Sequence, residues 1–101
     1  MLLGAGQRRS NIASGIDSIH NYYESLVLEE LYKVSERSRD DGEYLADTAC
    51  VALNRLPPRY IRHDVDMTFF MSGVELGEIA DKVTVAVKDA IAYVAARAAD
   101  D

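Results

Sequence analysis

The stretch "LADTACVALNRLPPRYIRH", residues Leu45 to His63, contains the change of pattern that decides the fold. Pro57 ends a helix here, because the residue before a proline is driven away from helical dihedral angles, and Pro58 extends the stop. The stretch therefore predicts a helix, a stiff turn and an extended segment. The apolar face of that helix is Leu45, Ala49, Ala52, Leu53 and Leu56.

Upstream of this stretch, the periodicity predicts one long helix from Asp17 to about Arg37, with Ser14 or Asp17 at its cap. The polar run "SERSRDDGE" that follows is typical of a connection, and Asp40 or Asp41 then starts the second helix. The apolar face of the first helix is Ile19, Tyr23, Leu26, Val27, Leu31 and Val34.

Downstream of the prolines, apolar and polar residues alternate from Asp64 to Met71, which predicts a strand. Its partner is either Arg59–Arg62 or the same strand of a second copy, because a lone strand leaves its edges unpaired. "SGVE", Ser72–Glu75, has the spacing of a capping box and starts the last helix. The apolar face of the last helix is Leu76, Ile79, Ala80, Val83, Val87, Ala90, Ile91 and Val94.

These elements predict a mainly α fold, with helices and one or two short β-strands, in a single small domain. The length of 101 residues fits one domain, and a domain of this size is often helped by self-association. Residues 1–15 carry glycines and small polar residues and are expected to be a flexible arm, so the domain proper spans residues 16–98.

The net charge of −6 argues against a general nucleic-acid or anionic-membrane binder. No apolar run approaches the roughly 18 residues that span a bilayer, and the N-terminus has no signal-peptide pattern, so a cytoplasmic protein is expected. Cys50, the single cysteine, forms no internal disulfide, and its apolar neighbours predict that it is buried.

The positive charge is nevertheless concentrated. Eight of the eleven cations are arginine, and Arg55, Arg59 and Arg62 lie within eight positions that hold no acid. If residues 59–62 are extended, Tyr60 and Arg62 share one side, which sets an aromatic ring beside a guanidinium fork. A ring stacks on a purine base, and the fork binds a phosphate or the O6/N7 edge of guanine. The alternative is a set of surface salt bridges to the acids of this chain.

A second basic cluster, Arg8, Arg9 and Asn11, lies in the N-terminal arm and is either a lid over an anionic ligand or plain arm. Enzyme chemistry is not predicted, because the chain has no glycine-rich phosphate loop and no recognisable nucleophile motif. "HDVD" would direct His63 and Asp64 to opposite faces of a strand, so no metal site is predicted. His20 is expected to be a partly exposed helix residue.

The sequences "IHNYYESLVLEEL" and "LADTACVALNRLPPRYIRHDVDMTFF" resemble the late-competence protein ComFB family. The resemblance covers roughly residues 17–98, is most specific at "ALNRLPPRY", and is closest to short, CdgR-like members described as cyclic-dinucleotide receptors. It implies a small helical homodimer that binds cyclic di-GMP, with cyclic di-AMP as a second candidate, and relays it to a regulatory partner such as a transcription factor. Some members with several cysteines bind zinc, and this chain departs from that pattern.

The resemblance and the residue chemistry meet at the same segment. We expect Arg59 and Arg62 to bind phosphate or guanine, Tyr60 to stack, and Asp64 to accept from guanine N–H groups. The full set expected to contact the ligand is Arg8, Arg9, Asn11, Arg55, Arg59, Tyr60, Arg62, His63 and Asp64. No cofactor, metal, direct nucleic-acid contact or membrane contact is expected. The alternative function is a ligand-free protein-interaction module, or regulatory adaptor, whose arginines face an acidic partner.

Overall fold

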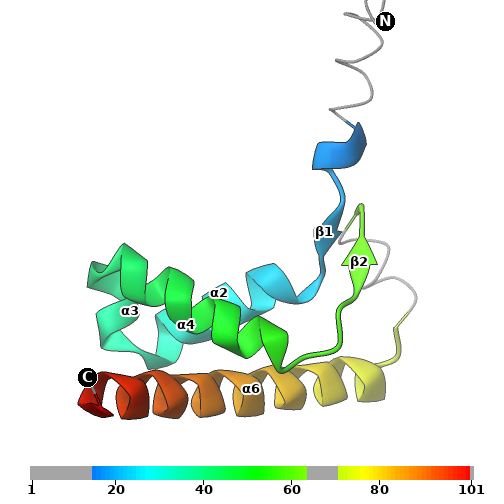
Figure 1. Cartoon of the computed structure of the whole chain (residues 1–101). Coiled ribbons are helices and arrows are strands. Elements are labelled where there is room, and N and C mark those ends of the chain that lie inside the picture. Colours follow the sequence, from blue (N-terminus) through cyan, green and yellow to red (C-terminus); the bar gives the residue numbers. More distant parts are fainter. Residues whose placement is uncertain (1–14, 64–70, 101) are drawn as a thin grey trace, which may run out of the picture.

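Helix α6 (Gly73–Asp100) is the longest element, and the other helices pack along one side of it in the computed structural model, which describes residues 15–63 and 71–100. Figure 1 shows α2 and α4 lying over α6, while two short strands project from the helices at the end where α6 begins. The predicted mainly helical fold is confirmed. The elements before α6 are β1 (His20–Asn21), α2 (Tyr23–Val34), α3 (Glu36–Asp40), α4 (Gly42–Asn54) and β2 (Tyr60–Ile61).

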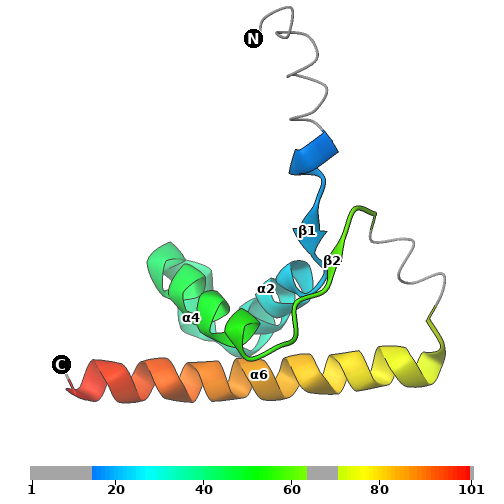
Figure 2. The same ribbon diagram turned by 45° about the vertical axis from the view of Figure 1, so that its right-hand side comes forward.

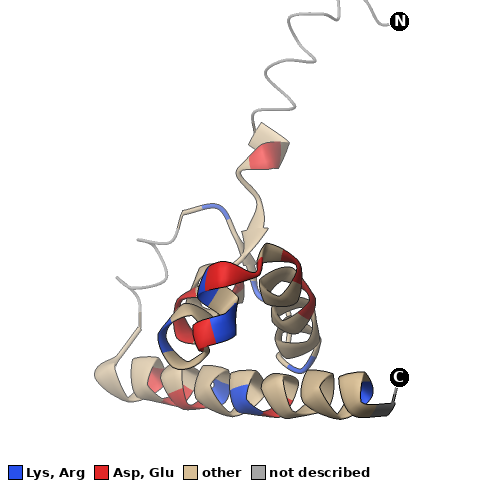
Figure 3. Cartoon of the chain, turned by 90° about the vertical axis from the view of Figure 1, so that its left-hand side faces the viewer, with Lys and Arg blue, Asp and Glu red and all other residues tan. Residues whose placement is uncertain are grey.

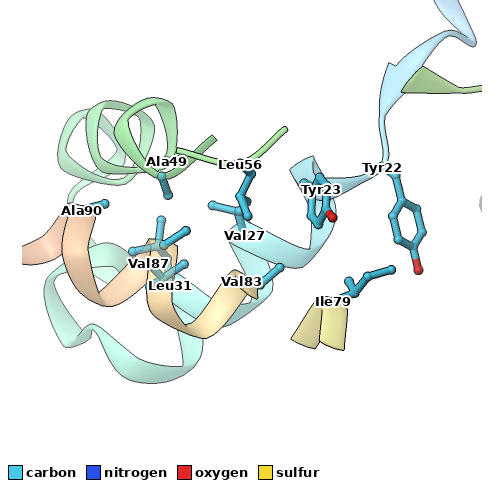
Figure 4. Close-up of a cluster of buried hydrophobic side chains, with 12 residues drawn as sticks. Tyr22, Tyr23, Val27, Leu31, Ala49, Leu56, Ile79, Val83, Val87 and Ala90 are labelled. Carbon is cyan, nitrogen blue, oxygen red and sulfur yellow. The ribbon is translucent and has the colours of Figure 1, made fainter. Parts of the chain in front are cut away.

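The apolar core lies where α2, α4 and α6 meet (Figure 4). It follows the predicted faces, because residues three and four apart on a helix point the same way. Three predicted members are wrong: Ile19 lies ahead of α2 and is exposed, Val34 is exposed at the end of that helix, and Ala80 is exposed on α6. The buried apolar residues are Tyr22, Tyr23, Val27, Leu31, Ala49, Ala52, Leu56, Ile79, Val83, Ala86, Val87 and Ala90.

The predicted first helix, Asp17 to Arg37, is too long at both ends. It begins only at Tyr23, after β1, so neither Ser14 nor Asp17 caps it, and His20 lies on a strand instead of a helix. Its end is set by Ser35, whose backbone is extended and whose hydroxyl accepts from the N–H of Ser38 at 3.3 Å. That cap starts α3 within the segment that the sequence pattern assigns to a connection.

Helix α4 begins where the sequence predicts, since the carboxylate of Asp41 accepts from the N–H of Tyr44 at 3.0 Å. It ends at Asn54, ahead of the two prolines. The predicted burial of Cys50 is wrong, because its thiol is exposed. Ala49 and Ala52 face the core, and the helical period turns the residue between them outward.

The predicted capping box at the start of α6 is confirmed. The N–H of Glu75 donates to Ser72 Oγ at 3.1 Å, and the N–H of Ser72 donates to Glu75 Oε1 at 3.3 Å. The predicted strand from Asp64 to Met71 falls outside the described residues except for Met71. Met71 lies just before the cap, is not in a strand, and packs against the core.

Candidate ligand-binding site

The segment after the prolines is extended, as predicted, and β2 pairs antiparallel with β1 in a two-stranded sheet. His20 is opposite Ile61, and Asn21 is opposite Tyr60. The N–H of Tyr22 also donates to the carbonyl oxygen of Arg59 at 2.7 Å. The pairing thus joins the chain just before α2 to the chain just after the prolines (Figure 2).

The buried side chain of Asn21 ties the two segments together. Its Oδ1 accepts from the N–H of Tyr23 at 3.1 Å and from the N–H of Arg59 at 3.2 Å. In return, the N–H of Asn21 donates to Glu24 Oε2 at 3.1 Å. One asparagine therefore binds the first N–H of α2, just ahead of the N-cap residue Tyr22, and fixes the backbone at the first arginine after the prolines.

Side chains on β2 alternate as an extended strand requires. Ile61 is half-buried against the core, whereas the side chain of Tyr60 is 68% exposed. Arg62 Nε donates to Ser18 Oγ at 2.8 Å, which holds its side chain along the segment before β1. The guanidinium of Arg59 makes no hydrogen bond or ion pair within the described part of the chain. Arg59 and Arg62 therefore flank the two-residue strand that carries the exposed ring of Tyr60.

Arg55 lies in a different environment from Arg59 and Arg62. It is the C-terminal cap of α4, and its guanidinium lies 5.5 Å from the ring centre of Tyr93 on α6. Arg97 lies 5.7 Å from the same ring and donates to the Tyr93 hydroxyl at 3.1 Å. The sequence pattern singles out neither Tyr93 nor Arg97. Their four-residue spacing predicts their own contact, but not the approach of Arg55 from another helix.

Four of the predicted contact residues, Arg8, Arg9, Asn11 and Asp64, lie outside the described residues. His63 is exposed, two residues after the end of β2. His20 Nδ1 lies 2.9 Å from the carbonyl oxygen of Ser18, next to the Arg62 contact.

The alternative interpretation of the arginines, as partners of the chain's own acids, finds no support among residues 15–63 and 71–100. The ion pair recorded there joins Arg37 to Asp41, and Arg55, Arg59 and Arg62 form none. Figure 3 places a basic segment at the far end of β2, clear of the acidic stretches on the helices. Exposed guanidinium groups without an acid partner favour an anionic ligand from outside this part of the chain.

Two other kinds of feature are absent from the described residues. They contain no group of three or more His, Cys, Asp or Glu side chains arranged to hold a metal ion. None of the helices in these ranges has the length and apolar character needed to cross a membrane.

Comparison with known families places this fold and strand segment in one of them. Residues 20–98 match the model of the family described as late competence development protein ComFB. The chain belongs to the ComFB family. The match begins at β1 and includes β2 and nearly all of α6. No curated protein and no solved structure matches the chain.

Proposed function

We propose that this protein is a cytoplasmic receptor for a cyclic dinucleotide, with cyclic di-GMP as the first ligand to test, and that it binds without catalysis. The observation that carries the proposal is the exposed segment Arg59–Arg62, which offers two guanidinium groups and a ring and has no acid partner within the described chain. The function of the described CdgR-like members of the family agrees with this chemistry. Cyclic di-AMP is the second ligand to test.

Each group has a chemical task in this proposal. The ring of Tyr60 stacks on a purine, an interaction that every base accepts. Arg59 and Arg62 then bind phosphate oxygens or the O6/N7 edge of guanine as charge-assisted forks. The backbone is already held by Asn21 and by strand pairing, so little ordering cost remains for the ligand to meet. Arg55, at Tyr93, has a secondary role.

The ligand is two-fold symmetric, so a homodimer that presents two copies of β2 suits it. In this proposal the liganded dimer passes the signal to a regulatory protein, such as a transcription factor. The second candidate function is a protein-interaction module without a small ligand. The exposed apolar side chains of α2 favour it, because exposed apolar patches mark interaction surfaces.

Isothermal calorimetry with cyclic di-GMP tests the proposal. Arg59→Ala and Arg62→Ala should each weaken binding about tenfold or more, because a hydrogen bond to a charged group contributes about 1.5–3 kcal/mol. Arg55→Ala should have a smaller effect. Lys88→Ala removes an exposed cation from α6 and is the matched control, which should bind like the wild type.

Two results would overturn the proposal. One is no heat of binding for cyclic di-GMP or cyclic di-AMP with a protein whose helical circular dichroism is intact, which would favour the interaction module. The other is unchanged affinity in both the Arg59 and the Arg62 variants, which would move the site away from β2.

A further inference from the structure

A broad groove runs between α2 and α6, on a different part of the surface from the arginines of β2. Its volume is about 920 Å³, and its floor is apolar. The side chains that form this floor come from three helices and include Leu26, Leu45, Leu76, Ile79 and Val83. A groove of this size and character is large enough for a helix.

Helix α2 borders the groove with apolar side chains that point away from its own core. Leu28 is 43% exposed and Tyr32 is 54% exposed, and both line the groove. They are four residues apart, so they form one stripe on the outer side of the helix. The core of the protein takes the neighbouring side, about 100° round the helix, through Val27 and Leu31. Helix α2 is therefore apolar on two sides, and one of them has no partner in this chain's described residues.

An acidic and a basic side chain lie beside that stripe, in an order that lets each pair with the other in a second, antiparallel copy of α2. Glu29 and Lys33 both line the groove, and neither forms an ion pair within the described part of the chain. Two antiparallel copies of α2 that cross between residues 30 and 31 set position 29 level with position 32 of the other copy, and position 28 level with position 33. One residue of rise, about 1.5 Å, then separates Glu29 from the level of Lys33 in the other copy, and the same offset separates Leu28 from the level of Tyr32. The side chains of both pairs are therefore within reach of each other.

We propose that the α2/α6 groove is the homodimer interface, and that α2 of a second copy fills it in an antiparallel, two-fold arrangement. A two-fold interface uses one surface twice, so the surface must match itself, and this one does in both its apolar and its charged residues. The proposal rests on the homodimer of the proposed function and assigns a face to it. It does not depend on which ligand binds.

The occupant is a second copy and not a helix of another protein, because the stripe and its flanking charges supply both halves of the contact. A helix of 12 residues is about 18 Å long, and the groove walls on α6 add to the area that it covers.

Sedimentation velocity without nucleotide tests the apolar stripe. The wild type should be a dimer at micromolar concentration, and Leu28→Glu or Tyr32→Glu should weaken dimerisation at least tenfold. Both side chains are already partly in water, so each variant should keep its helical circular dichroism. Val85→Glu is the matched control, since Val85 is exposed on α6 but lines a different hollow, beside Pro57. It should remain a dimer.

A charge-swap experiment tests the arrangement itself. Glu29→Lys and Lys33→Glu should each dissociate the dimer, because each places like charges at both contacts. An equal mixture of the two variants should dimerise again, because each lysine then faces a glutamate of the other chain. Like-charge repulsion within each helix persists in the mixture, so recovery can come only from contacts between chains.

Three outcomes would overturn this inference. If the wild type stays monomeric at 100 μM, no second copy occupies the groove and the proposed interface is wrong. A dimer that survives both glutamate variants of the stripe has its interface elsewhere. A mixture of charge variants that stays monomeric refutes the antiparallel register. Calorimetry with cyclic di-GMP is a separate measurement, so failure of the ligand proposal remains distinguishable from each of these results.

Discussion

At the scale of single residues, Asn21 connects the helical core to the candidate site. Its side-chain oxygen accepts from two backbone N–H groups, one at the start of α2 and one at Arg59. No other hydrogen bond recorded for the described side chains joins α2's first turn to the segment after the prolines. The position of Arg59 and Arg62, which flank β2, therefore depends on a residue that carries no charge.

Replacing Asn21 with alanine should lower the free energy of unfolding by about 1–2 kcal/mol, because the buried acceptor of two backbone N–H groups is lost. Urea unfolding measures this loss. Cyclic di-GMP should also bind more weakly in calorimetry, because the ligand must then order the Arg59 backbone. Asn21→Asp keeps an acceptor and should lose less than Asn21→Ala.

The matched control for this prediction is Asn54→Ala, at the exposed end of α4. It should change stability by no more than about 0.5 kcal/mol, as is usual for surface positions. An Asn21→Ala protein as stable as the wild type would show that the two backbone N–H groups find other partners.

At the scale of elements, the helix starts are fixed by side-chain caps, and one of them makes stability depend on pH. The N–H of Tyr44 donates to the carboxylate of Asp41 and lowers the pKa of Asp41 below its ordinary value of 3.8, and the nearby guanidinium of Arg37 lowers this pKa further. A lowered pKa in the folded state means that the ionised carboxylate stabilises α4.

This contribution is present above the ordinary pKa of 3.8 and is lost as pH falls through the lower pKa of the folded state. Asp41→Asn should therefore be less stable than the wild type at pH 7, and the difference should shrink as pH falls below 3.8. Thermal unfolding of both proteins between pH 7 and 3 measures it. Asp40→Asn, one residue away, should follow the wild type throughout. A difference between wild type and Asp41→Asn that is constant with pH would contradict the assignment.

Local signals explain which elements were predictable. The Ser72–Glu75 box and the Asp41 cap are complete within four residues, so the sequence alone predicts where α6 and α4 start. Helix α3 was not predicted because its apolar content is too low to produce a periodic pattern, and its cap, Ser35, lies inside the polar run. Strand β1 has two residues and forms only because β2, far along the chain, pairs with it.

The candidate site was predictable to the same limited extent. The two prolines correctly predict an extended segment after them, whereas the outward direction of the Tyr60 side chain is known only from the structure. The contact of Arg62 with Ser18 and that of Arg55 with Tyr93 join residues distant in sequence, and no local pattern encodes them. The burial of Cys50 was predicted wrongly from its apolar neighbours in sequence. Such neighbours do not bury a residue when the helical period turns its side chain outward.

At the scale of the whole molecule, the apolar core is small, because it extends along only part of the length of α6. Helix α6 has 28 residues and is about 42 Å long, whereas α2 and α4 have 12 and 13 residues and are each about 20 Å long. Several of the buried apolar residues are small, namely Ala49, Ala52, Ala86 and Ala90. Small side chains bury little area, so association is expected to contribute to the stability of the folded chain.

Thermal melting at different protein concentrations measures this contribution. If the dimer is the stable folded form, a tenfold increase in concentration should raise Tm by about 3–6 °C, because binding to the folded state stabilises it by mass action. Tyr32→Glu should melt lower, with a Tm independent of concentration, and Val85→Glu should behave like the wild type. A wild-type Tm that does not change with concentration would mean that the monomer is stable alone.

The pairing of β1 with β2 also bears on the order in which the chain folds. The hydrogen bond between Asn21 and Arg59 spans 38 residues, whereas the contacts of α2, α3 and α4 with one another join nearer parts of the chain. Closing a long loop costs entropy that short-range contacts do not incur, so the α2–α4 hairpin is expected to form before the strands pair and before α6 packs on it. A molecule that presents Arg59 and Arg62 beside paired strands has therefore already formed its helical hairpin, and a ligand that requires those strands selects such chains over less folded ones.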